Sequence, residues 1–557
     1  MKKNRLIIFI LVACFVLSVF CFAGLNETAH AATKTVDIYA INDFHGAVDQ
    51  MPKIAGYLAA RKKEGAVILN SGDMFQGSME SNSNFGKLLS ECMDVAGFDA
   101  FTYGNHEFDW GLDNLRNLAS NSAVPFLGAN IYNWNAQTFE WGEFASDLAE
   151  PYNIVEVGDV KVGVIGVIGK DQITSISSQL VQSIGFKEPL PIVKELATDL
   201  RQNKQCDVVV VSAHVGPQEF VGEGENYKKP SNAAGLQDYV DAVFCAHTHA
   251  EQSFVVDGIP FIQGKRYGDF VSHVQLSVNG NEVKYVKSEN ISYSNLNDID
   301  QDVYNAVKTK IDNSNAAIAT EAKQVLATLT GGNLNSQTAV PRLVCHAVAE
   351  YAAEQGYQIE LAMVNNARNQ LSQGNITYTS LYEAIPFDNV VYIAKVSGKD
   401  ILNEAKYDSN SIWRVSGTAI ENSSTKYYTI AVIDYLLYHQ NSSRTYNYFP
   451  SAFRSGFTPV ALTKEGVEMY NYRLLTRDFL LKTETINASN YVKDNVHTKA
   501  GDLKRSVDLP VYSSDAPSGG LPVYVIALII VGAVLVVAAT VTLVLVLVLR
   551  KKRAKAN

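Results

Sequence analysis

The sequence predicts an α/β fold: a layered N-terminal α/β domain, a smaller α+β domain, and a C-terminal transmembrane helix. Three observations support this prediction. From residue 34 to about residue 290, short apolar runs alternate with longer helical stretches, which is typical of layered α/β domains. About 480 residues lie between the two ends of the chain, which is enough for two domains, and the second, an α+β domain, is expected over residues 333–510. A long uncharged apolar stretch lies near the C-terminus.

The chain begins with the features of a secretory signal peptide. Basic side chains among residues 1–5 precede an apolar stretch at residues 6–23. The sequence Ala29-His30-Ala31 then has the small residues of a cleavage site. We expect residues 1–31 to be cleaved off. The alternative, an uncleaved membrane anchor, is disfavoured by the small residues at the cleavage site. The mature protein would then lie outside the cytoplasm.

Residues 34–297 are predicted to form the layered domain. Its helical stretches are residues 53–63, 82–96 and 191–203. Its last part, residues 254–285, is predicted to form consecutive strands. Asp257-Gly258 and Asn279-Gly280 mark the turns between them, because Asp-Gly and Asn-Gly favour tight hairpins.

A helical connector is predicted between the two domains. Residues 298–332 have helical periodicity and many alanines, and the helix is expected to stop at Gly331-Gly332. The second domain should then cover residues 333–510.

The C-terminal end has the features of a membrane anchor. Residues 523–549 are 27 apolar or small uncharged residues, and a basic tail at residues 550–557 follows directly. At about 1.5 Å per residue, this helix exceeds a hydrocarbon core of roughly 30 Å. The positive-inside rule places the tail in the cytoplasm and the body outside. Residues 511–522, rich in Ser, Gly and Pro, are predicted to be a flexible linker.

Composition limits the class of protein. Aromatic residues make up 10% and charged residues 19% of the chain, which is typical of a folded protein. The net charge of −10 argues against a nucleic-acid polymer as partner. After loss of the signal peptide four cysteines remain without a C-x-x-C pair, so a zinc–thiolate site is not expected. They are Cys92, Cys206, Cys245 and Cys345, expected as buried thiols with one disulfide possible.

Metal-binding side chains follow five short apolar runs. The runs are residues 36–41, 66–69, 101–103, 208–211 and 243–245. Short apolar strands are usually buried in a sheet, and α/β sheets bind ligands along their carboxyl edge. We therefore expect seven side chains to meet there with enough nitrogen and oxygen donors for two divalent ions. They are Asp43, His45, Asp73, Asn105, His214, His247 and His249.

The distribution of histidines strengthens this prediction. A single histidine after a strand is usually a structural residue. Here five of the ten histidines follow the runs, at positions 45, 106, 214, 247 and 249. If the chain stays extended, the alternation in Asp43-x-His45 and in His247-x-His249 points both members of each pair the same way.

These segments resemble those of the bacterial and animal 5′-nucleotidases in the calcineurin-like metallophosphoesterase superfamily. That family includes UDP-sugar hydrolases and cyclic-nucleotide phosphodiesterases. The resemblance covers about residues 34–290, with Ala246 where the family usually has glycine. The matching segments are residues 42–46, 71–78, 104–111, 212–216 and 246–249.

The resemblance implies a role for each site residue. Asp73 would bridge the two ions. Asp43, His45 and His249 would complete one metal site, and Asn105, His214 and His247 the other. The donors include no sulfur, which suits zinc, manganese, iron or cobalt.

His106 is not a ligand by the same resemblance. It would face the phosphate and stabilise the charge that develops in the transition state. The carboxylate of Asp109, three residues on, could orient this imidazole and raise its pKa. The alternative for Asp109 is a helix N-cap.

The second domain keeps part of the family's substrate-binding pattern. Residues 364–368 resemble its NxGGxR segment, while residues 374–378 and 385–389 match its G-x-I-T-Y and PFxN signatures. Arg368 is the candidate phosphate clamp, because a guanidinium can grip phosphate oxygens with two hydrogen bonds. A surface arginine without a role is the alternative.

The base-binding part of this domain departs from the family. Residues 428–437 resemble the strand that leads to a stacking aromatic, which implies Tyr435. Residues 439–444 replace the family's GGDG loop. Tyr446 or Tyr448 could supply the second ring, or could serve only in packing.

The expected function is that of a membrane-anchored extracellular phosphohydrolase that releases phosphate from nucleotides, as a 5′-nucleotidase does. Its partners would be a small nucleotide or phosphate ester and, through one helix, the membrane. The alternatives are a 2′,3′-cyclic-nucleotide phosphodiesterase, a nucleotide-sugar pyrophosphatase, and a surface nucleotide-binding protein without turnover.

Overall fold

The computed structural model describes residues 33–499, except 225–227, 281, 406–409, 415–419, 441–448, 468–469 and 493–496. The expected signal peptide, linker and C-terminal membrane helix therefore lie outside the described residues. Within the described ranges, every helix is too short or too polar to cross a membrane.

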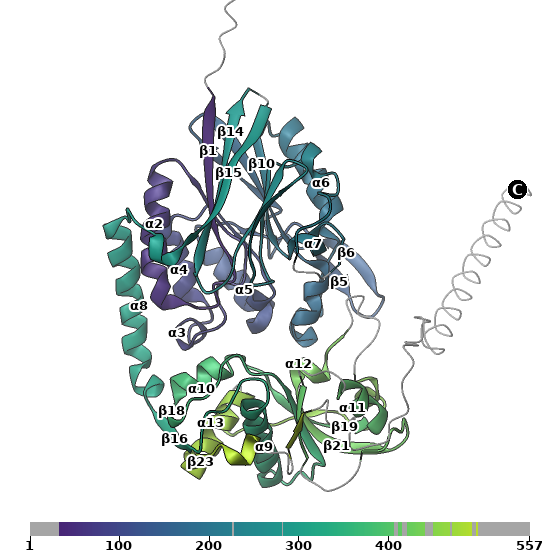
Figure 1. Ribbon diagram of the computed structural model, residues 1–557. Coiled ribbons are helices and arrows are strands. Elements are labelled where there is room, and N and C mark those ends of the chain that lie inside the picture. The colour runs from purple at the N-terminus through teal and green to yellow at the C-terminus, as the bar shows by residue number, and fades with distance from the viewer. Residues whose placement is uncertain are drawn as a thin grey trace, which may run out of the picture. The chain divides into compact units, whose positions relative to one another are not determined.

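The chain divides into two compact units (Figure 1). Unit 1 comprises the described residues up to Gln324 together with Thr377–Phe387. Unit 2 comprises Val325–Ile376 and the described residues from Asp388 onward. The chain thus enters unit 2, returns to unit 1 for one short segment, and then completes unit 2.

The first sheet of unit 1 has six strands in the order β15–β14–β1–β2–β3–β4. Strands β1 to β4 are parallel neighbours, while β14 and β15 are antiparallel additions. The strands are β1 (Lys34–Ile41), β2 (Val67–Asn70), β3 (Ala100–Thr102), β4 (Phe126–Leu127), β14 (Phe270–Asn279) and β15 (Glu282–Ser292).

The second sheet of unit 1 also has six strands, in the order β12–β13–β11–β10–β8–β7. Its four central strands are parallel, and β12 and β7 are antiparallel edges. The predicted turns at Asp257-Gly258 and Asn279-Gly280 join β12 to β13 and β14 to β15. The strands are β7 (Tyr152–Val157), β8 (Val160–Ile168), β10 (Val208–His214), β11 (Ala242–Cys245), β12 (Glu251–Val256) and β13 (Ile259–Gly264).

The two sheets pack face to face and carry helices on their outer faces. Val36 and Ile38 of β1 share one buried apolar cluster with Val208 and Val210 of β10, between the sheets. The alternate side chains of β1 pack instead in a cluster with α2, α4 and α5, and α6 covers the second sheet. These helices are α2 (Met51–Lys63), α4 (Lys87–Ala96), α5 (Gly111–Asn121) and α6 (Pro189–Gln202). The predicted layered domain is therefore a four-layer α/β/β/α sandwich (Figure 1).

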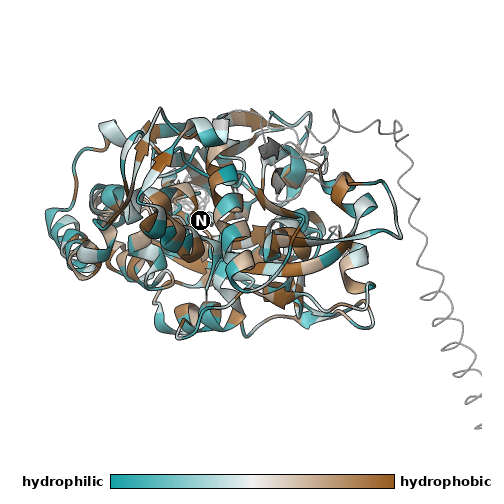
Figure 2. Ribbon diagram, turned by 90° about the horizontal axis from the view of Figure 1, so that it is seen from below, coloured by the Kyte–Doolittle hydropathy of each residue, from teal (hydrophilic) through white to brown (hydrophobic). Residues whose placement is uncertain are grey.

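The amphipathic character of the helices is visible in Figure 2, where they carry both hydrophilic and hydrophobic residues. One predicted helix is divided: residues 82–96 contain the end of α3 (Met79–Asn82), a turn, and α4. Gly86 adopts φ 86° in this turn, and an added Cβ would lie 2.8 Å from the Phe75 side chain. Smaller elements of unit 1 are β5 (Ile131–Asn135), β6 (Glu140–Phe144), β9 (Ile184–Phe186), α7 (Pro217–Phe220) and α10 (Tyr378–Ala384).

The predicted connecting helix is correct in its first part and wrong in its last. Helix α8 (Gln301–Ala322) begins where the Asp300 carboxylate accepts hydrogen bonds from the backbone N–H groups of Asp302 and Val303. Residues 325–330 were expected to continue the helix, but they form β16 (Val325–Thr330). This strand pairs in parallel with β23 (Thr485–Asn487), a distant partner that local periodicity does not reveal.

Unit 2 is built on a six-stranded sheet in the order β22–β19–β21–β17–β20–β24 and a three-stranded sheet in the order β18–β16–β23. The remaining strands are β17 (Leu361–Asn365), β18 (Gly374–Thr377), β19 (Val391–Ser397), β20 (Asn410–Arg414), β21 (Tyr427–Ile433), β22 (Val460–Ala461) and β24 (His497–Lys499). The helices are α9 (Ala339–Glu354), α11 (Gly398–Glu404), α12 (Asp434–Leu437), α13 (Tyr472–Thr483) and α14 (Ser489–Val492).

Leu69→Ala tests the importance of the packing between the two sheets of unit 1. Leu69 is fully buried in the cluster between them. Its truncation should lower the free energy of unfolding by about 2–5 kcal/mol, because a cavity remains in a close-packed core. Denaturant unfolding measures this loss. Val286→Ala is the matched control, since Val286 is 47% exposed and its truncation should cost less than about 0.5 kcal/mol. Equal losses in the two variants would contradict this assignment of the core.

Candidate metal centre

The predicted ligands lie at the carboxyl ends of five strands or in the loops that follow them. Strands β1, β2 and β3 of the first sheet lead to residues 43–45, 73 and 105–106. In the second sheet, His214 ends β10, and residues 247–249 follow β11. These strand ends were expected along one sheet edge, whereas they belong to the edges of two facing sheets.

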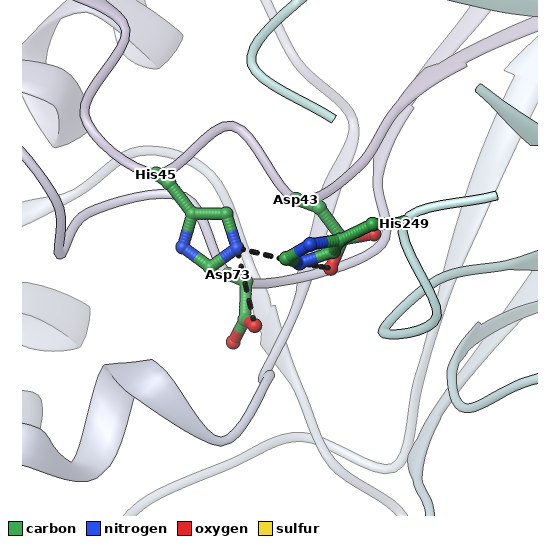
Figure 3. Close-up of side chains that lie close together, drawn as sticks. All are labelled: Asp43, His45, Asp73 and His249. Carbon is green, nitrogen blue, oxygen red and sulfur yellow. Dashed lines mark hydrogen bonds and ion pairs between the residues drawn. The ribbon is translucent and has the colours of Figure 1, made fainter. Parts of the chain in front are cut away.

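The first group of donors consists of Asp43, His45, Asp73 and His249 (Figure 3). One ligand atom from each lies within 4.8 Å of all the others. His45 Nε2 is 2.9 Å from His249 Nε2, which is 3.4 Å from Asp43 Oδ1. Two imidazole nitrogens and two carboxylates from three different loops therefore point to one place.

The second group consists of Asp73, His214 and His247, whose ligand atoms also lie within 4.8 Å of one another. Asn105 joins this group, because its Oδ1 is 3.3 Å from His214 Nε2 and 3.1 Å from His247 Nδ1. Asp73 belongs to both groups: its Oδ2 is 3.3 Å from His214 Nε2 and 3.7 Å from His45 Nε2. One carboxylate thus faces both sets of donors.

Most of these residues have a strained backbone. Five of the seven expected ligands have positive φ angles: Asp43 (48°), His45 (47°), Asp73 (54°), His247 (70°) and His249 (56°). Asp43-x-His45 and His247-x-His249 are therefore not extended, so the condition under which alternation would align each pair is not met. Non-glycine residues in this region cost on the order of 1–3 kcal/mol each and cluster at functional sites.

Hydrogen bonds hold this strained backbone and orient the rings. The backbone N–H of His45 donates to the carbonyl of Asp73 at 2.9 Å. His214 Nδ1 lies 2.9 Å from the Ser71 carbonyl, so this nitrogen carries the proton and Nε2 is left to bind a metal. A backbone N–H also orients the Asp43 side chain: both of its carboxylate oxygens accept from the N–H of His247 at 3.0 Å.

Glu107 supports the site and was not identified from the sequence. It is fully buried. Its carboxylate accepts hydrogen bonds from the backbone N–H groups of Asp73 (2.9 Å), Met74 (2.9 Å) and Gly104 (2.7 Å). These bonds tie the loop after β2 to the loop after β3. A glutamate is usually exposed, so only its place within a strand-end motif could have indicated this role.

His106 lies between the metal donors and Asp109. Its backbone N–H donates to Asp73 Oδ1 at 2.9 Å, and its Nδ1 lies 2.8 Å from Asp109 Oδ2. The residue preceding α5 is Trp110, and no side-chain cap bonds the start of that helix. The geometry of Asp109 is thus that of a carboxylate orienting an imidazole.

A second ring covers His106 within unit 1. The Phe387 ring stacks on the imidazole with centroids 5.5 Å apart and an interplanar angle of 22°. The preceding carbonyl, of Pro386, accepts hydrogen bonds from the Gln76 and Asn82 side-chain amides, both at 3.1 Å. From the sequence this segment is only a signature of the second domain, so its position beside His106 was not predicted.

The pKa shifts of His214 and His247, two of the expected ligands, have opposite directions. Burial opposes protonation of His214, but the Asp73 carboxylate outweighs it and raises the pKa of His214 to about 9. Burial and the nearby His214 lower the pKa of His247 to about 4. Burial and the Asp73 carboxylate raise the pKa of Glu107 to about 7, although its backbone donors favour the charged form.

The donor set fits divalent transition metals. It provides four imidazoles, two carboxylates and one amide oxygen in two overlapping groups, with no sulfur. Imidazole with carboxylate suits zinc, manganese, iron or cobalt.

The other expected site residues lie in unit 2 or outside the described residues. Arg368 is exposed in the segment after β17. Tyr435 is half-buried in α12, and its ring lies 5.4 Å from that of His439. Tyr446 and Tyr448 fall outside the described residues. Cys92, Cys206, Cys245 and Cys345 are all buried, as expected.

Comparison with known families identifies two domains. Residues 36–251 match the calcineurin-like phosphoesterase family, and residues 317–421 match the 5′-nucleotidase C-terminal domain. Calcineurin-like phosphoesterases use two divalent metal ions, and the cluster of Asp and His donors is compatible with such a site.

Similar curated proteins cover much of the chain at low identity. Endonuclease YhcR of Bacillus subtilis is 26% identical over 68% of the chain, which spans only 33% of that larger protein. An apyrase of Tabanus yao is 24% identical over 70% of the chain and 78% of its own length. The cell wall protein Lmo0130 of Listeria monocytogenes is 23% identical over 71% of the chain and 59% of its own length.

The fold is also found in solved structures. The 5′-nucleotidase precursor of Thermus thermophilus superposes with a TM-score of 0.62. It covers 81% of this chain and 97% of its own, at 17% identity. At this level of identity the likeness establishes the fold.

The pKa of His214 predicts opposite effects of pH on stability and on metal binding. A folded-state pKa of about 9 lies above the ordinary value of 6.5. The metal-free protein should therefore have its full stabilisation from this group below pH 6.5 and lose it as the pH rises to 9. Metal binding releases the same proton, so affinity should rise over this range by up to about tenfold per pH unit. Thermal unfolding in EDTA and manganese titration measure the two trends. Flat profiles between pH 6.5 and 9 would contradict the assignment.

Glu107→Gln should weaken metal binding although residue 107 donates no ligand atom. The amide would place an NH2 group against backbone N–H donors that now point at a carboxylate. Loss of such supporting contacts typically costs about 10–100-fold in metal affinity. Calorimetric titration with manganese measures the effect. Glu64→Gln, at an exposed glutamate paired with Arg61, is the control. Unchanged affinity in Glu107→Gln would show that these bonds do not position Asp73.

Proposed function

We propose that this chain is a dinuclear-metal hydrolase that releases phosphate from nucleotides outside the cytoplasm. The proposal starts from its family, since the chain belongs to the calcineurin-like metallophosphoesterases that carry a 5′-nucleotidase C-terminal domain. The observation that carries this proposal is the position of Asp73 within both groups of donors. A carboxylate shared in this way is suited to bridging two ions. The other donors then divide into Asp43, His45 and His249 on one side and Asn105, His214 and His247 on the other.

The ions, when bound, would polarise the phosphoryl group and generate hydroxide near neutral pH. The chain's own residues would prepare the site for an anionic substrate. Asn105 supplies a neutral oxygen where a further carboxylate would repel the phosphate. The bonds from Glu107 hold the loops of Asp73 and Asn105 in a fixed relation before substrate arrives.

His106 would act on the phosphoryl group itself. Its Nδ1 is bonded to Asp109, which leaves Nε2 as the nitrogen able to contact substrate. The Asp109 carboxylate would hold the ring in place, and a protonated ring would stabilise the charge that builds on the phosphoryl oxygens. His106 and Asp109 together thus form a proton-donating pair beside the metal ligands.

Substrate recognition is proposed to involve the second domain. Arg368 would grip phosphate oxygens, and Tyr435 would stack on the base, with Tyr446 or Tyr448 as the second ring. Support comes from the match to the 5′-nucleotidase C-terminal domain and from the exposure of Arg368. Cyclic-nucleotide phosphodiesterase and nucleotide-sugar pyrophosphatase activities would use the same metals and differ only in this recognition.

The proposed location is the outer face of the membrane. The predicted signal peptide and the apolar stretch at residues 523–549 support secretion followed by anchoring. One relative, Lmo0130, is named a cell wall protein. The alternative of a surface binding protein without turnover is disfavoured, because the donors, His106 and Asp109 are all retained and positioned together.

A substrate panel tests the proposed function. The protein from residue 32 to 512 is incubated with manganese or zinc and with AMP, UDP-glucose, 2′,3′-cyclic nucleotides or p-nitrophenyl phosphate. Metal-dependent phosphate release from AMP is the expected result. Nucleotide binding without hydrolysis would instead support the binding protein.

Asp73→Asn and His106→Ala should each lower turnover at least about 100-fold, for different reasons. Asp73→Asn removes the shared carboxylate and should also lower the metal content. His106→Ala should retain metal and lose only turnover. Elemental analysis alongside phosphate release separates the two effects.

Asp113→Asn is the control for these variants, because that carboxylate is fully exposed and pairs with Arg116. Near-normal rates in either site variant would refute the role given to that residue. Loss of metal from His106→Ala would make His106 a ligand and not a proton donor.

A further inference from the structure

A short loop beside the metal donors carries an exposed arginine, Arg266. The loop runs from Lys265 to Gly268, directly after β13. Three of its four residues have positive φ: Lys265 (62°), Tyr267 (56°) and Gly268 (73°). Such strain persists only where surrounding contacts hold it, and it is concentrated at functional positions.

Hydrogen bonds fix the backbone on both sides of Arg266. The Lys265 carbonyl accepts from the Asn42 side chain at 2.8 Å, and the Tyr267 N–H donates to the Asp43 carbonyl at 2.8 Å. The loop is thus attached to the same segment that supplies a metal donor, Asp43. These bonds therefore fix the position of the Arg266 backbone relative to the metal donor Asp43.

The guanidinium of Arg266 lies against the metal donor His249. Its Nη1 is 3.3 Å from His249 Nδ1, and the group sits 4.8 Å from the centre of the Tyr267 ring. The Tyr267 ring in turn makes an edge contact with His45, with centroids 5.8 Å apart. His249 is also partly exposed, at 19% of its side chain, so this is an accessible side of the site.

The Arg266 guanidinium forms no ion pair with any residue that the structure describes. The neighbouring Lys265 differs, because its ammonium pairs with Asp269 at 2.9 Å. Arg266 is therefore a cation at the rim of the site whose charge is not neutralised by a carboxylate. In a chain of net charge −10, such a cation can attract an anionic substrate locally.

Metal binding changes what Arg266 faces. A guanidinium only donates hydrogen bonds, so in the present arrangement His249 Nδ1 accepts and Nε2 carries the proton. If Nε2 becomes a ligand, the proton must reside on Nδ1. Nδ1–H and the guanidinium are then two donors directed at one region, and an anionic oxygen is the group that satisfies both.

We infer that Arg266, with Nδ1–H of His249, binds an anionic phosphoryl group adjacent to the one held by the metal ions. Arg266 is thereby a specificity-determining residue that favours nucleoside diphosphates and pyrophosphate-linked nucleotides over monophosphates. This inference rests on the proposed function, because it needs a phosphoryl group at the metal donors. The guanidinium suits the task, since its planar fork matches phosphate oxygens and the Tyr267 ring orients it.

The test compares substrates with one and two phosphoryl groups on the full-length, manganese-loaded protein. The variants are Arg266→Ala, Arg266→Lys and, as control, Lys265→Ala. Calorimetry measures the binding of α,β-methylene-ADP, and kinetics are measured on ADP, AMP and p-nitrophenyl phosphate.

Arg266→Ala should weaken binding of the analogue at least tenfold and lower kcat/KM for ADP by a similar factor. The losses for AMP and p-nitrophenyl phosphate should be below threefold. Lysine should restore part of the ADP activity, and Lys265→Ala should behave as the wild type.

The outcomes separate the inference from the proposed function. Analogue binding by Arg266→Ala within twofold of wild type would overturn the inference, and so would equal losses on ADP and p-nitrophenyl phosphate. In both cases hydrolysis by the wild-type protein would still support the proposed function. No hydrolysis of any ester by the wild type would refute the proposed function, while calorimetry would still report whether Arg266 binds the second phosphoryl group.

Discussion

The position of the Asp73 carboxylate is the constraint on which the rest of the site depends. Asp73 follows β2, and its side chain faces donors from both sheets of unit 1. One oxygen accepts the backbone N–H of His106, while the other faces the nitrogens of His214 and His45. Its own N–H is held by Glu107. Any displacement of this residue would therefore disturb both groups of metal donors and the proposed proton donor together.

The fold provides this convergence at a cost in local strain. Two mostly parallel sheets pack face to face on an apolar core, and the carboxyl ends of their strands lie at the same end of that core. Left-handed backbone conformations at Asp43, Asp73 and His247, among others, direct the donor side chains of the two sheets toward one another. Glycines complete the turns: a Cβ on Gly72 would lie 2.6 Å from His214 Nδ1 and 2.7 Å from the Gly104 nitrogen. The core thus supplies the stability that a strained, preorganised site requires.

Much of the candidate site could be predicted because its signals are local. Short apolar runs followed by His, Asp or Asn indicate strand ends, and shared strand direction brings those ends together. What the sequence could not reveal depends on distant contacts. The pairing of β16 with β23 turned a predicted helix end into a strand. The division of the strands between two sheets also has no local signal.

Residues that act through long-range contacts were missed for the same reason. Glu107 is a glutamate whose function is visible only once its carboxylate is seen among backbone N–H groups of two loops. Phe387 lies 281 residues after His106 in the sequence, yet it stacks on that imidazole. The strained backbone at the ligands was likewise unexpected, since alternation alone suggested extended chain.

Anomalous diffraction from crystals grown with manganese would locate the metal ions. We expect two anomalous peaks about 4 Å apart, with Asp73 between them. One peak should be coordinated by Asp43, His45 and His249, and the other by Asn105, His214 and His247. A single peak, or two peaks without a shared contact to Asp73, would contradict a dinuclear centre bridged by this carboxylate.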